Sequence, residues 1–422
     1  MHNNELLLFS SGRLGSDSVV SFSASDHTTW YVNGRGELFG CGRNDYGQQG
    51  SGSTMNIGAF TKRADNVAKV KATNTTTWYL TKNGELYGCG LNDCGQQGSG
   101  NTTNVLTFTK RADEVDMFDA SEKTTIFSKG LDVYLCGAGN RGQQANGSTK
   151  NVTTFTKRDT STGTILNIIA RNEISLYLYK SGDYYYYPKI CGANSYSQLG
   201  IFSTTDQKTF KTGLRSEFTT ASYENEASRV FGISNYTQVG YYVPSQSKFQ
   251  MCGRNDYGQK FLGHTDSSTS TSTVTARKVF VADFSSFLLG RSNSDAGVHA
   301  VGLNNYGQLG TGNTKNIIEK AHVLTGSTFN DAFIVPTNST TWVLNKAVLY
   351  GCGRNDRGQQ GSGGTDNVLT FTQRATAVTE VQASELTTWY LNSDGELHGC
   401  GDNTYGQQGG VGDYVTTFTK RN

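Results

Sequence analysis

The sequence lacks both a long apolar run and a basic leader. No stretch reaches the about 18 consecutive apolar residues that a membrane-spanning helix requires. Residues 1–9 contain no Lys or Arg, and their apolar run from Leu6 to Phe9 is too short for the core of a signal peptide. We therefore expect a chain that is synthesised in the cytosol without a signal peptide and has no membrane span.

An excess of charge of one sign is also missing, since 37 Lys and Arg residues face 35 Asp and Glu residues. This balance argues against a protein whose whole surface binds nucleic acid or a membrane, although it is compatible with a local basic patch. Proline is scarce, with 3 residues, and no long stretch has the helix period, whereas Thr, Tyr, Phe, Val and Gly are frequent. The composition therefore favours an all-β chain.

The cysteines show none of the Cys-x-x-Cys or Cys/His spacings that are typical of metal sites. All but Cys94 occupy one position of a repeated motif, and one copy of the motif has Val301 there, so the position requires a small apolar side chain. Equivalent positions in a ring of repeats lie too far apart for disulfide bonds. We therefore expect free buried thiols, no metal and no cofactor. The repeated cysteines are Cys41, Cys89, Cys136, Cys191, Cys252, Cys352 and Cys400.

One motif, which reads GCGRNDYGQQG at residues 40–50, recurs along almost the whole chain. The glycine that follows the cysteine position marks its copies at residues 42, 90, 137, 192, 253, 302, 353 and 401. A repeat of this length is typical of solenoids, propellers and arrays. The motif itself has a structural explanation, because its glycines permit unusual backbone angles and its Asn and Gln side chains satisfy turn backbone groups.

The unit of residues 66–113 shows how each repeat is expected to fold. Residues 67–72 alternate apolar and polar side chains, as in a half-buried strand. Residues 76–80, 85–90 and 106–111 are further strand candidates, rich in β-branched and aromatic residues. Four short strands in each unit of about 48 residues are typical of a propeller blade.

We therefore predict an all-β chain that forms a closed β-propeller of eight four-stranded blades, with seven blades plus one atypical repeat as the alternative. The propeller would be a single domain of residues 18–422, and residues 1–17 would form an N-terminal extension or a clip strand. We also expect the last strand, near 418–421, to pair with the first, near 19–22, inside one blade. The predicted units are 18–65, 66–113, 114–160, 161–215, 216–277, 278–325, 326–375 and 376–422.

The pattern Gly-x-Asn-x-x-Gly-Gln-Leu/Gln-Gly, preceded by a hairpin that reads Trp-Tyr-x-x-x-x-Gly-Glu-Leu-x-Gly-Cys-Gly, resembles the repeat of the regulator of chromosome condensation family. Leu199 and Leu309 stand where that repeat has Leu. The resemblance covers residues 18–422 and implies a closed β-propeller, usually of seven blades, so eight copies are a departure. It implies a scaffold used for nucleotide exchange on small GTPases, chromatin binding, light sensing, enzyme inhibition, or binding in secreted or viral proteins. We expect a viral or microbial member.

Units four and five depart most from the internal consensus, and both are rich in tyrosine. Exposed Tyr beside Ser, Asn and Gly is typical of adaptable recognition surfaces. The alternative is that these side chains pack within longer strands. The candidate partner-binding residues are Tyr184, Tyr185, Tyr186, Tyr187, Tyr236, Tyr241 and Tyr242.

A Lys-Arg pair recurs at the end of the fourth strand of several units. Rotational repetition would place these pairs on one rim, where they could meet an anionic polymer or an acidic partner. The alternative is that they protect outer edge strands from pairing with other chains. The candidate rim residues are Lys62, Arg63, Lys110, Arg111, Lys157, Arg158, Lys420 and Arg421.

Catalysis has little support, because the histidines fall at unrelated repeat positions and no Ser/His/Asp or Cys/His grouping can be assembled. We predict a non-catalytic structural and recognition module of a virion, such as a phage tail or baseplate protein. Its partners would be subunits of a larger assembly and a host cell-surface ligand, with no nucleic acid, and it would be oligomeric or bound to the assembly. One alternative is an intracellular adaptor or guanine-nucleotide-exchange-type regulator in the cytoplasm. A second alternative is an enzyme inhibitor or an enzyme that acts at the propeller mouth.

Overall fold

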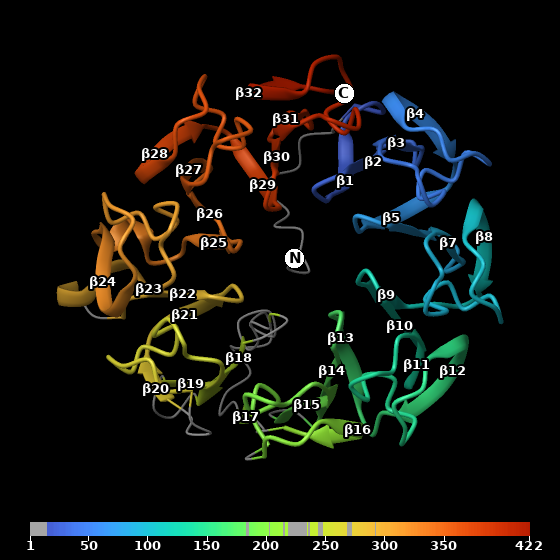
Figure 1. Ribbon diagram of the computed structural model, residues 1–422, viewed down its shortest axis with the longest axis horizontal. Helices are drawn as coiled ribbons and strands as arrows, with labels where there is room; N and C mark the ends of the chain where they lie inside the picture. Colours follow the sequence, from blue (N-terminus) through green and yellow to red (C-terminus); the bar gives the residue numbers. More distant parts are fainter. Residues whose placement is uncertain are drawn as a thin grey trace.

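The described strands form antiparallel sheets that are arranged as the blades of a ring (Figure 1). In each four-stranded blade the first strand lies beside the centre and the last strand lies at the outer rim. The side chains of residues 185–186, 216–217, 237–243 and 293 are not described. The computed structural model describes residues 15–182, 185–201, 203–213, 216–217, 234, 237–243, 248–267, 272–291 and 293–422.

The strands follow one another in chain order within each blade. The first four blades contain β1 (Val19–Ala24), β2 (Thr28–Asn33), β3 (Leu38–Gly42), β4 (Ile57–Ala64), β5 (Val67–Ala72), β6 (Thr76–Thr81), β7 (Leu86–Gly90), β8 (Val105–Ala112), β9 (Met117–Ala120), β10 (Thr124–Lys129), β11 (Asp132–Gly137), β12 (Val152–Thr160), β13 (Thr164–Ala170), β14 (Ile174–Ser181), β15 (Tyr185–Gly192), β16 (Gln207–Thr212) and β17 (Ser216–Glu217). The other four contain β18 (Thr237–Val243), β19 (Lys248–Gly253), β20 (Ser272–Thr275), β21 (Lys278–Val281), β22 (Ser285–Leu289), β23 (Gly297–Gly302), β24 (Ile317–Thr325), β25 (Phe333–Pro336), β26 (Thr340–Asn345), β27 (Val348–Gly353), β28 (Val368–Ala375), β29 (Val378–Ala383), β30 (Thr387–Asn392), β31 (Leu397–Asp402) and β32 (Tyr414–Lys420). Two short 3-10 helices, η3 (Asn293–Asp295) and η4 (Ser327–Phe329), lie in blades six and seven.

The all-β prediction is confirmed, and the described strands form eight sheets, as the eight-blade prediction requires. Six of these sheets have four strands. Blade four has five, because β17 also pairs with β15, and the described part of blade five has three. Repetition of one strand pattern therefore produces repetition of one blade.

The hydrophobic core lies between neighbouring blades. Trp78, at the centre of β6, is fully buried and packs with Leu86 of its own blade and with Val115 and Phe118 of the next blade. Similar clusters of buried side chains join the other blades. Because apolar burial is the main favourable term in folding, each blade depends on its neighbours for stability.

In the four blades that contain a tryptophan, the glycine before the repeated cysteine makes room for the indole ring. A Cβ added at Gly40, in β3, would lie 2.4 Å from the Trp30 ring in β2. The same approach occurs in blade two, where a Cβ at Gly88 would lie 2.5 Å from the Trp78 ring. These distances are too short for any side chain, so the glycine allows the indole to lie across the neighbouring strand.

The motif asparagine holds its loop together through both side-chain atoms. Asn44 Nδ2 donates to Ser51 Oγ at 3.0 Å, and to the carbonyl oxygens of Ser53 and Met55 at 2.9 Å each. Asn44 Oδ1 accepts a hydrogen bond from Gln49 N at 2.8 Å. One buried amide therefore satisfies several loop backbone groups, which a hydrophobic side chain could not do.

The first glutamine of the motif links six of the described blades to the next blade. Gln48 Nε2 donates to the carbonyl of Asn74 in blade two at 3.1 Å, and the Gln48 carbonyl accepts from Cys89 Sγ at 3.4 Å. The same side-chain bond recurs from Gln96 to Glu122, Gln143 to Asn172, Gln308 to Asn338, Gln359 to Glu385 and Gln407 to Asp26.

The prediction that the last strand pairs with the first is wrong. β32 pairs with β31, and β1 pairs with β2, so blades one and eight are each complete. Gln382 Nε2 instead donates to the carbonyl of Phe22 at 2.9 Å, and Phe22 packs in a cluster with Trp389. Because the last blade already contains four strands of its own, it has no vacant position for a strand from the other end.

We predict that Gly40→Ala destabilises the protein, because its methyl group would overlap the buried Trp30 ring. Relieving such overpacking costs about 1–3 kcal/mol. Gly58→Ala, on β4 of the same blade, is the matched control, since a Cβ there meets nothing within 4 Å. Urea unfolding should show a lower midpoint for the first variant and a midpoint near wild type for the second; equal midpoints would contradict the packing argument.

A second pair of variants tests the link between blades. Gln96→Leu should lower the free energy of unfolding by at least about 2 kcal/mol, because buried groups in two blades lose hydrogen-bond partners. Gln97→Leu should change it by about 1 kcal/mol or less, since it removes one hydrogen bond, from Gln97 Nε2 to the Cys89 carbonyl at 2.8 Å, and Leu199 and Leu309 occupy this position in other blades. Guanidinium unfolding of both variants gives the comparison, and a larger loss for Gln97→Leu would reverse the assignment.

Candidate functional site

The innermost strands surround a central channel of about 550 Å³. The loops between the first and second strands of the blades meet at one end of this channel, because equivalent loops of a ring lie on the same face. One position of these loops carries either a carboxylate or an amide side chain. In the described blades these residues are Asp26, Asn74, Glu122, Asn172, Asp283, Asn338 and Glu385. We call this end of the channel the acidic mouth.

The side chains of the acidic mouth join neighbouring blades. Glu122 Oε1 accepts a hydrogen bond from Asn74 N at 2.8 Å, which connects blades three and two. Asp26 Oδ1 accepts from Leu386 N at 2.8 Å, which connects blades one and eight. At these junctions a side-chain oxygen accepts the hydrogen bond, and both carboxylates and amides carry such an oxygen.

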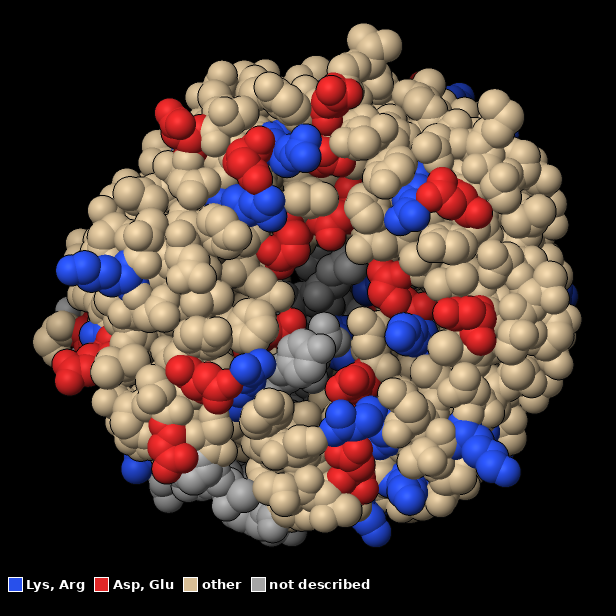
Figure 2. Space-filling view, in the orientation of Figure 1, with Lys and Arg blue, Asp and Glu red and all other residues tan. Residues whose placement is uncertain are grey.

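Three of the carboxylates at the mouth lack a cationic partner in the described part of the chain. Within the described part of the chain, Asp26, Glu122 and Glu385 form no ion pair with Lys or Arg. Burial raises the pKa of the Glu385 carboxyl, and the charges of Asp26 and Asp283 also raise it, whereas hydrogen bonds from Ser339 and from the Asn338 amide lower it. Figure 2 shows Asp and Glu side chains around the opening of the channel, with Lys and Arg side chains among them. The mouth therefore presents a negative potential to solvent.

The arginines of the surrounding motif loops are neutralised within the fold. Arg43 stacks against Tyr46 and against Tyr405 of blade eight, with its guanidinium carbon 5.3 and 5.2 Å from the two ring centroids. Its Nε also pairs with Asp45 Oδ2 at 2.7 Å. Similar ion pairs join Arg254 to Asp256 and Arg354 to Asp356.

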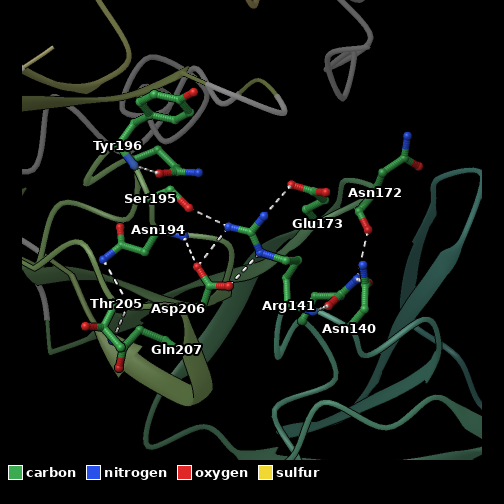
Figure 3. Close-up of polar contacts among 12 residues, drawn as sticks. Asn140, Arg141, Asn172, Glu173, Asn194, Ser195, Tyr196, Thr205, Asp206 and Gln207 are labelled. Atoms are coloured by element: carbon green, nitrogen blue, oxygen red, sulfur yellow. Dashed lines mark hydrogen bonds and ion pairs between the residues drawn. The ribbon is translucent and has the colours of Figure 1, made fainter.

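The junction between blades three and four replaces this stack with an ion-pair network (Figure 3). Arg141 stands where the first motif has Tyr46, and its Nε pairs with Asp206 Oδ2 at 2.5 Å. Its Nη2 donates to Ser195 Oγ at 2.6 Å, and its Nη1 lies 3.8 Å from Glu173 Oε2. Arg141 is therefore held by groups of the next blade, and this junction is polar where others are aromatic.

The structure describes the predicted tyrosine surface only in part. Tyr187 is partly buried and stacks on Tyr179, with ring centroids 5.3 Å apart, beside the core between blades three and four. Tyr184 and Tyr236 lie outside the described residues, and Tyr185, Tyr186, Tyr241 and Tyr242 are described only as backbone of β15 and β18.

The predicted basic rim lies on outer strands β4, β8, β12 and β32, and its lysines have carboxylate partners. Lys62 Nζ pairs with Glu37 Oε1 at 2.8 Å and with Asp65 Oδ1 at 2.7 Å. Lys110 pairs in the same way with Glu85, Lys157 with Asp132 and Lys420 with Glu396. Burial lowers the pKa of the neighbouring guanidinium groups of Arg63, Arg111, Arg158 and Arg421.

The acidic mouth was not identified from the sequence, although its signal is present there. Asp26, Glu122 and Glu385 each stand two residues before the first Thr of a Thr-Thr pair, at one repeat position. Each looks like an ordinary turn residue until the ring brings the copies together. Within the described residues, no group of three or more His, Cys, Asp or Glu side chains could hold a metal ion. The described chain also contains no helix that is long and apolar enough to cross a membrane.

The repeat of blade two matches a known family. A family model for the regulator of chromosome condensation (RCC1) repeat matches residues 67–96, which run from β5 into the motif loop. A search of curated proteins found no match.

Solved structures share the architecture over most of their length. Human WBSCR16 has 15% sequence identity and a TM-score of 0.54, and the alignment covers 87% of this chain and 84% of that chain. Prp20p from Saccharomyces cerevisiae, described with its binding properties to Gsp1p and histones, has 14% identity and a TM-score of 0.55, with 97% and 87% coverage. Yeast RCC1 (Prp20) bound to Kap60 has 13% identity and a TM-score of 0.56, with 100% and 91% coverage. These likenesses concern the fold, and together with the repeat match they identify the chain as an RCC1-like β-propeller.

Proposed function

We propose that the chain is a non-catalytic protein-interaction module that binds a Lys- or Arg-rich segment of a partner protein at the acidic mouth. The observation that carries this proposal is the uncompensated charge of Asp26, Glu122 and Glu385 at the open end of a channel. A cationic side chain that enters the mouth would supply the missing counter-charges. Low-dielectric walls strengthen such attraction and raise the rate of association.

The hydrogen bonds of the mouth also favour binding. Glu122 and Glu385 each accept a backbone N–H at 2.8 Å, so their side chains are already ordered before a partner arrives. An ordered site loses less side-chain entropy on association than a mobile one. The mouth is therefore preorganised for a cationic ligand.

The comparisons favour the adaptor or regulator alternative over a virion component. The structure of yeast Prp20p was described with binding to Gsp1p and histones, and histones are rich in Lys and Arg. None of the reported likenesses supports a phage tail, a baseplate or a host-surface ligand. We retain the tyrosine surface of blades four and five and the basic rim as proposals for secondary contacts with the same partner.

We predict that the triple variant Asp26→Asn, Glu122→Gln and Glu385→Gln binds a synthetic Lys/Arg-rich histone-tail peptide at least about tenfold more weakly than the wild type. The amides keep an oxygen for the backbone hydrogen bonds but remove the charges. Fluorescence anisotropy at several salt concentrations should show both the loss of affinity and a shallower salt dependence. Glu319→Gln, at an exposed position of β24, is the control for loss of a carboxylate elsewhere on the surface and should bind like wild type. Unchanged affinity in the triple variant would refute the proposal.

The single variant Glu385→Gln separates binding from stability. Because the pKa of Glu385 is raised in the folded protein, its protonated form stabilises the fold at low pH, and this contribution is lost as the pH rises through the raised pKa. A neutral amide should therefore leave stability at neutral pH unchanged or slightly higher. Thermal unfolding at pH 7 and pH 4 tests this, and a large loss of stability at pH 7 would show that the carboxylate is structural.

A further inference from the structure

The sequence contains three Asn-Gly pairs, at residues 33–34, 83–84 and 146–147. An asparagine before a glycine can deamidate, because the main-chain nitrogen of the glycine attacks the side-chain amide carbon and glycine has no side chain to obstruct the approach. The attack requires both groups to leave their native contacts. The contacts of each pair therefore decide how fast it reacts in the folded protein.

Asn83 lies at the tip of the hairpin between β6 and β7. Gly84 has a φ of 79°, as in a three-residue hairpin loop, and its main-chain N–H donates to the Thr81 carbonyl at 3.1 Å within the same turn. The Asn83 side chain is exposed and forms no hydrogen bond within the described part of the chain. A single local bond thus restrains the attacking nitrogen, and the carboxamide is free to turn toward it.

The pair at Asn33 is held much more tightly, and Asn33 is buried. Asn33 Nδ2 donates to Glu37 Oε2 at 2.8 Å, and Asn33 Oδ1 accepts from the main-chain N–H groups of Arg35 and Glu37 at 3.1 and 3.0 Å. The Gly34 N–H donates at 2.9 Å to the Ser18 carbonyl, which lies outside the hairpin. The carboxamide therefore cannot turn toward Gly34 without breaking several hydrogen bonds.

The pair at Asn146 is restrained across a blade junction. Asn146 Oδ1 accepts from Ser148 N at 3.0 Å and from Ser148 Oγ at 3.1 Å. The Gly147 N–H donates at 2.8 Å to the carbonyl of Lys208, which belongs to β16 in blade four. Asn83 therefore differs from both other asparagines in its free carboxamide and in the purely local bond of the nitrogen that follows it.

We propose that Asn83 is a site of spontaneous deamidation in the folded protein, which converts it to isoaspartate and aspartate. The Gly84 nitrogen bonds to Asn83 Cγ, the Cγ–Nδ2 bond breaks, and the proton of the Gly84 nitrogen passes through solvent to the ammonia that leaves. Water then opens the resulting succinimide ring. Addition of water at Cγ gives aspartate, and addition at the main-chain carbonyl carbon gives isoaspartate, so one water replaces one ammonia in the whole change.

Isoaspartate at this position would weaken the junction between blades two and three. The Gly84 carbonyl accepts from the Val115 N–H at 2.9 Å, and Val115 packs with Trp78 in the core between these blades. Isoaspartate routes the main chain through Cβ, so one additional carbon precedes Gly84 and displaces its carbonyl. Aspartate keeps the native main chain and therefore keeps this bond.

The site is independent of the acidic mouth and of the proposed function. The mouth loop of blade two precedes β6 and the hairpin that carries Asn83 follows it, so the two lie at opposite ends of the strand. Deamidation here therefore affects the lifetime of the scaffold and leaves the charge of the mouth unchanged.

The test is peptide mapping of the full chain by mass spectrometry after incubation in mildly alkaline buffer made with water enriched in ¹⁸O. Asn83 should acquire the label at least about tenfold faster than Asn33 and Asn146, since its reaction requires a single local bond to open. The same incubation in concentrated urea is the control, because unfolding removes the contacts that protect the other two pairs, and the three rates should converge. Equal rates in the folded protein, or a difference that persists in urea, would overturn the proposal.

Two variants test the effect on the junction. Asn83→Ser cannot form the succinimide and should keep its urea midpoint on ageing, and Asn83→Asp, which carries the added charge on a native main chain, should unfold like fresh wild type. Aged wild type enriched in isoaspartate should unfold at a lower urea concentration than both variants. An unchanged midpoint in that sample, or an equal loss in aged Asn83→Ser, would refute the weakened junction.

Discussion

The ring depends on the bond that the first motif glutamine makes to the next blade. Its side-chain amide donates to a carbonyl of the neighbouring inner loop, and its own carbonyl accepts from the neighbouring cysteine, as Gln48 does with Asn74 and Cys89. A thiol in this place is buried and stays protonated, since burial raises the pKa of Cys89 well above its usual range. The repeated cysteines therefore act as weak hydrogen-bond donors within a structural link, and we assign them no other chemical role.

The same link fixes the loops at the channel mouth and leaves their charge free to vary. Several inner loops use one side-chain oxygen to accept a backbone N–H of the neighbouring blade, and both Glu122 and Asn338 do so. The choice between acid and amide therefore has little effect on the scaffold and a large effect on the field at the mouth. In this way a stable ring separates the residues that hold the blades from those that set the binding chemistry.

The repeat pattern predicts the blades well, because strand period and turn residues are local properties. Ring closure was missed, since β32 and β1 resemble consecutive strands of a middle unit and local similarity does not show where a blade begins. The carboxylates that neutralise the rim lysines lie about one hairpin away in the chain, as Glu37 does from Lys62. The acidic mouth arises only when residues of different blades meet around the axis, as Asn74 and Glu122 do.

Closure without an exchanged strand makes the junction of blades one and eight a contact between two complete blades. The two ends of the ring meet at Gly395, whose carbonyl accepts from Val19 N at 2.8 Å and from Asn422 Nδ2 at 3.1 Å. The order of the blades along the chain is therefore incidental to the assembled ring. A circular permutant that joins these ends and opens between two other blades would retain all the contacts between blades. Duplication of a whole unit would likewise leave every blade intact, because each blade is built from consecutive strands.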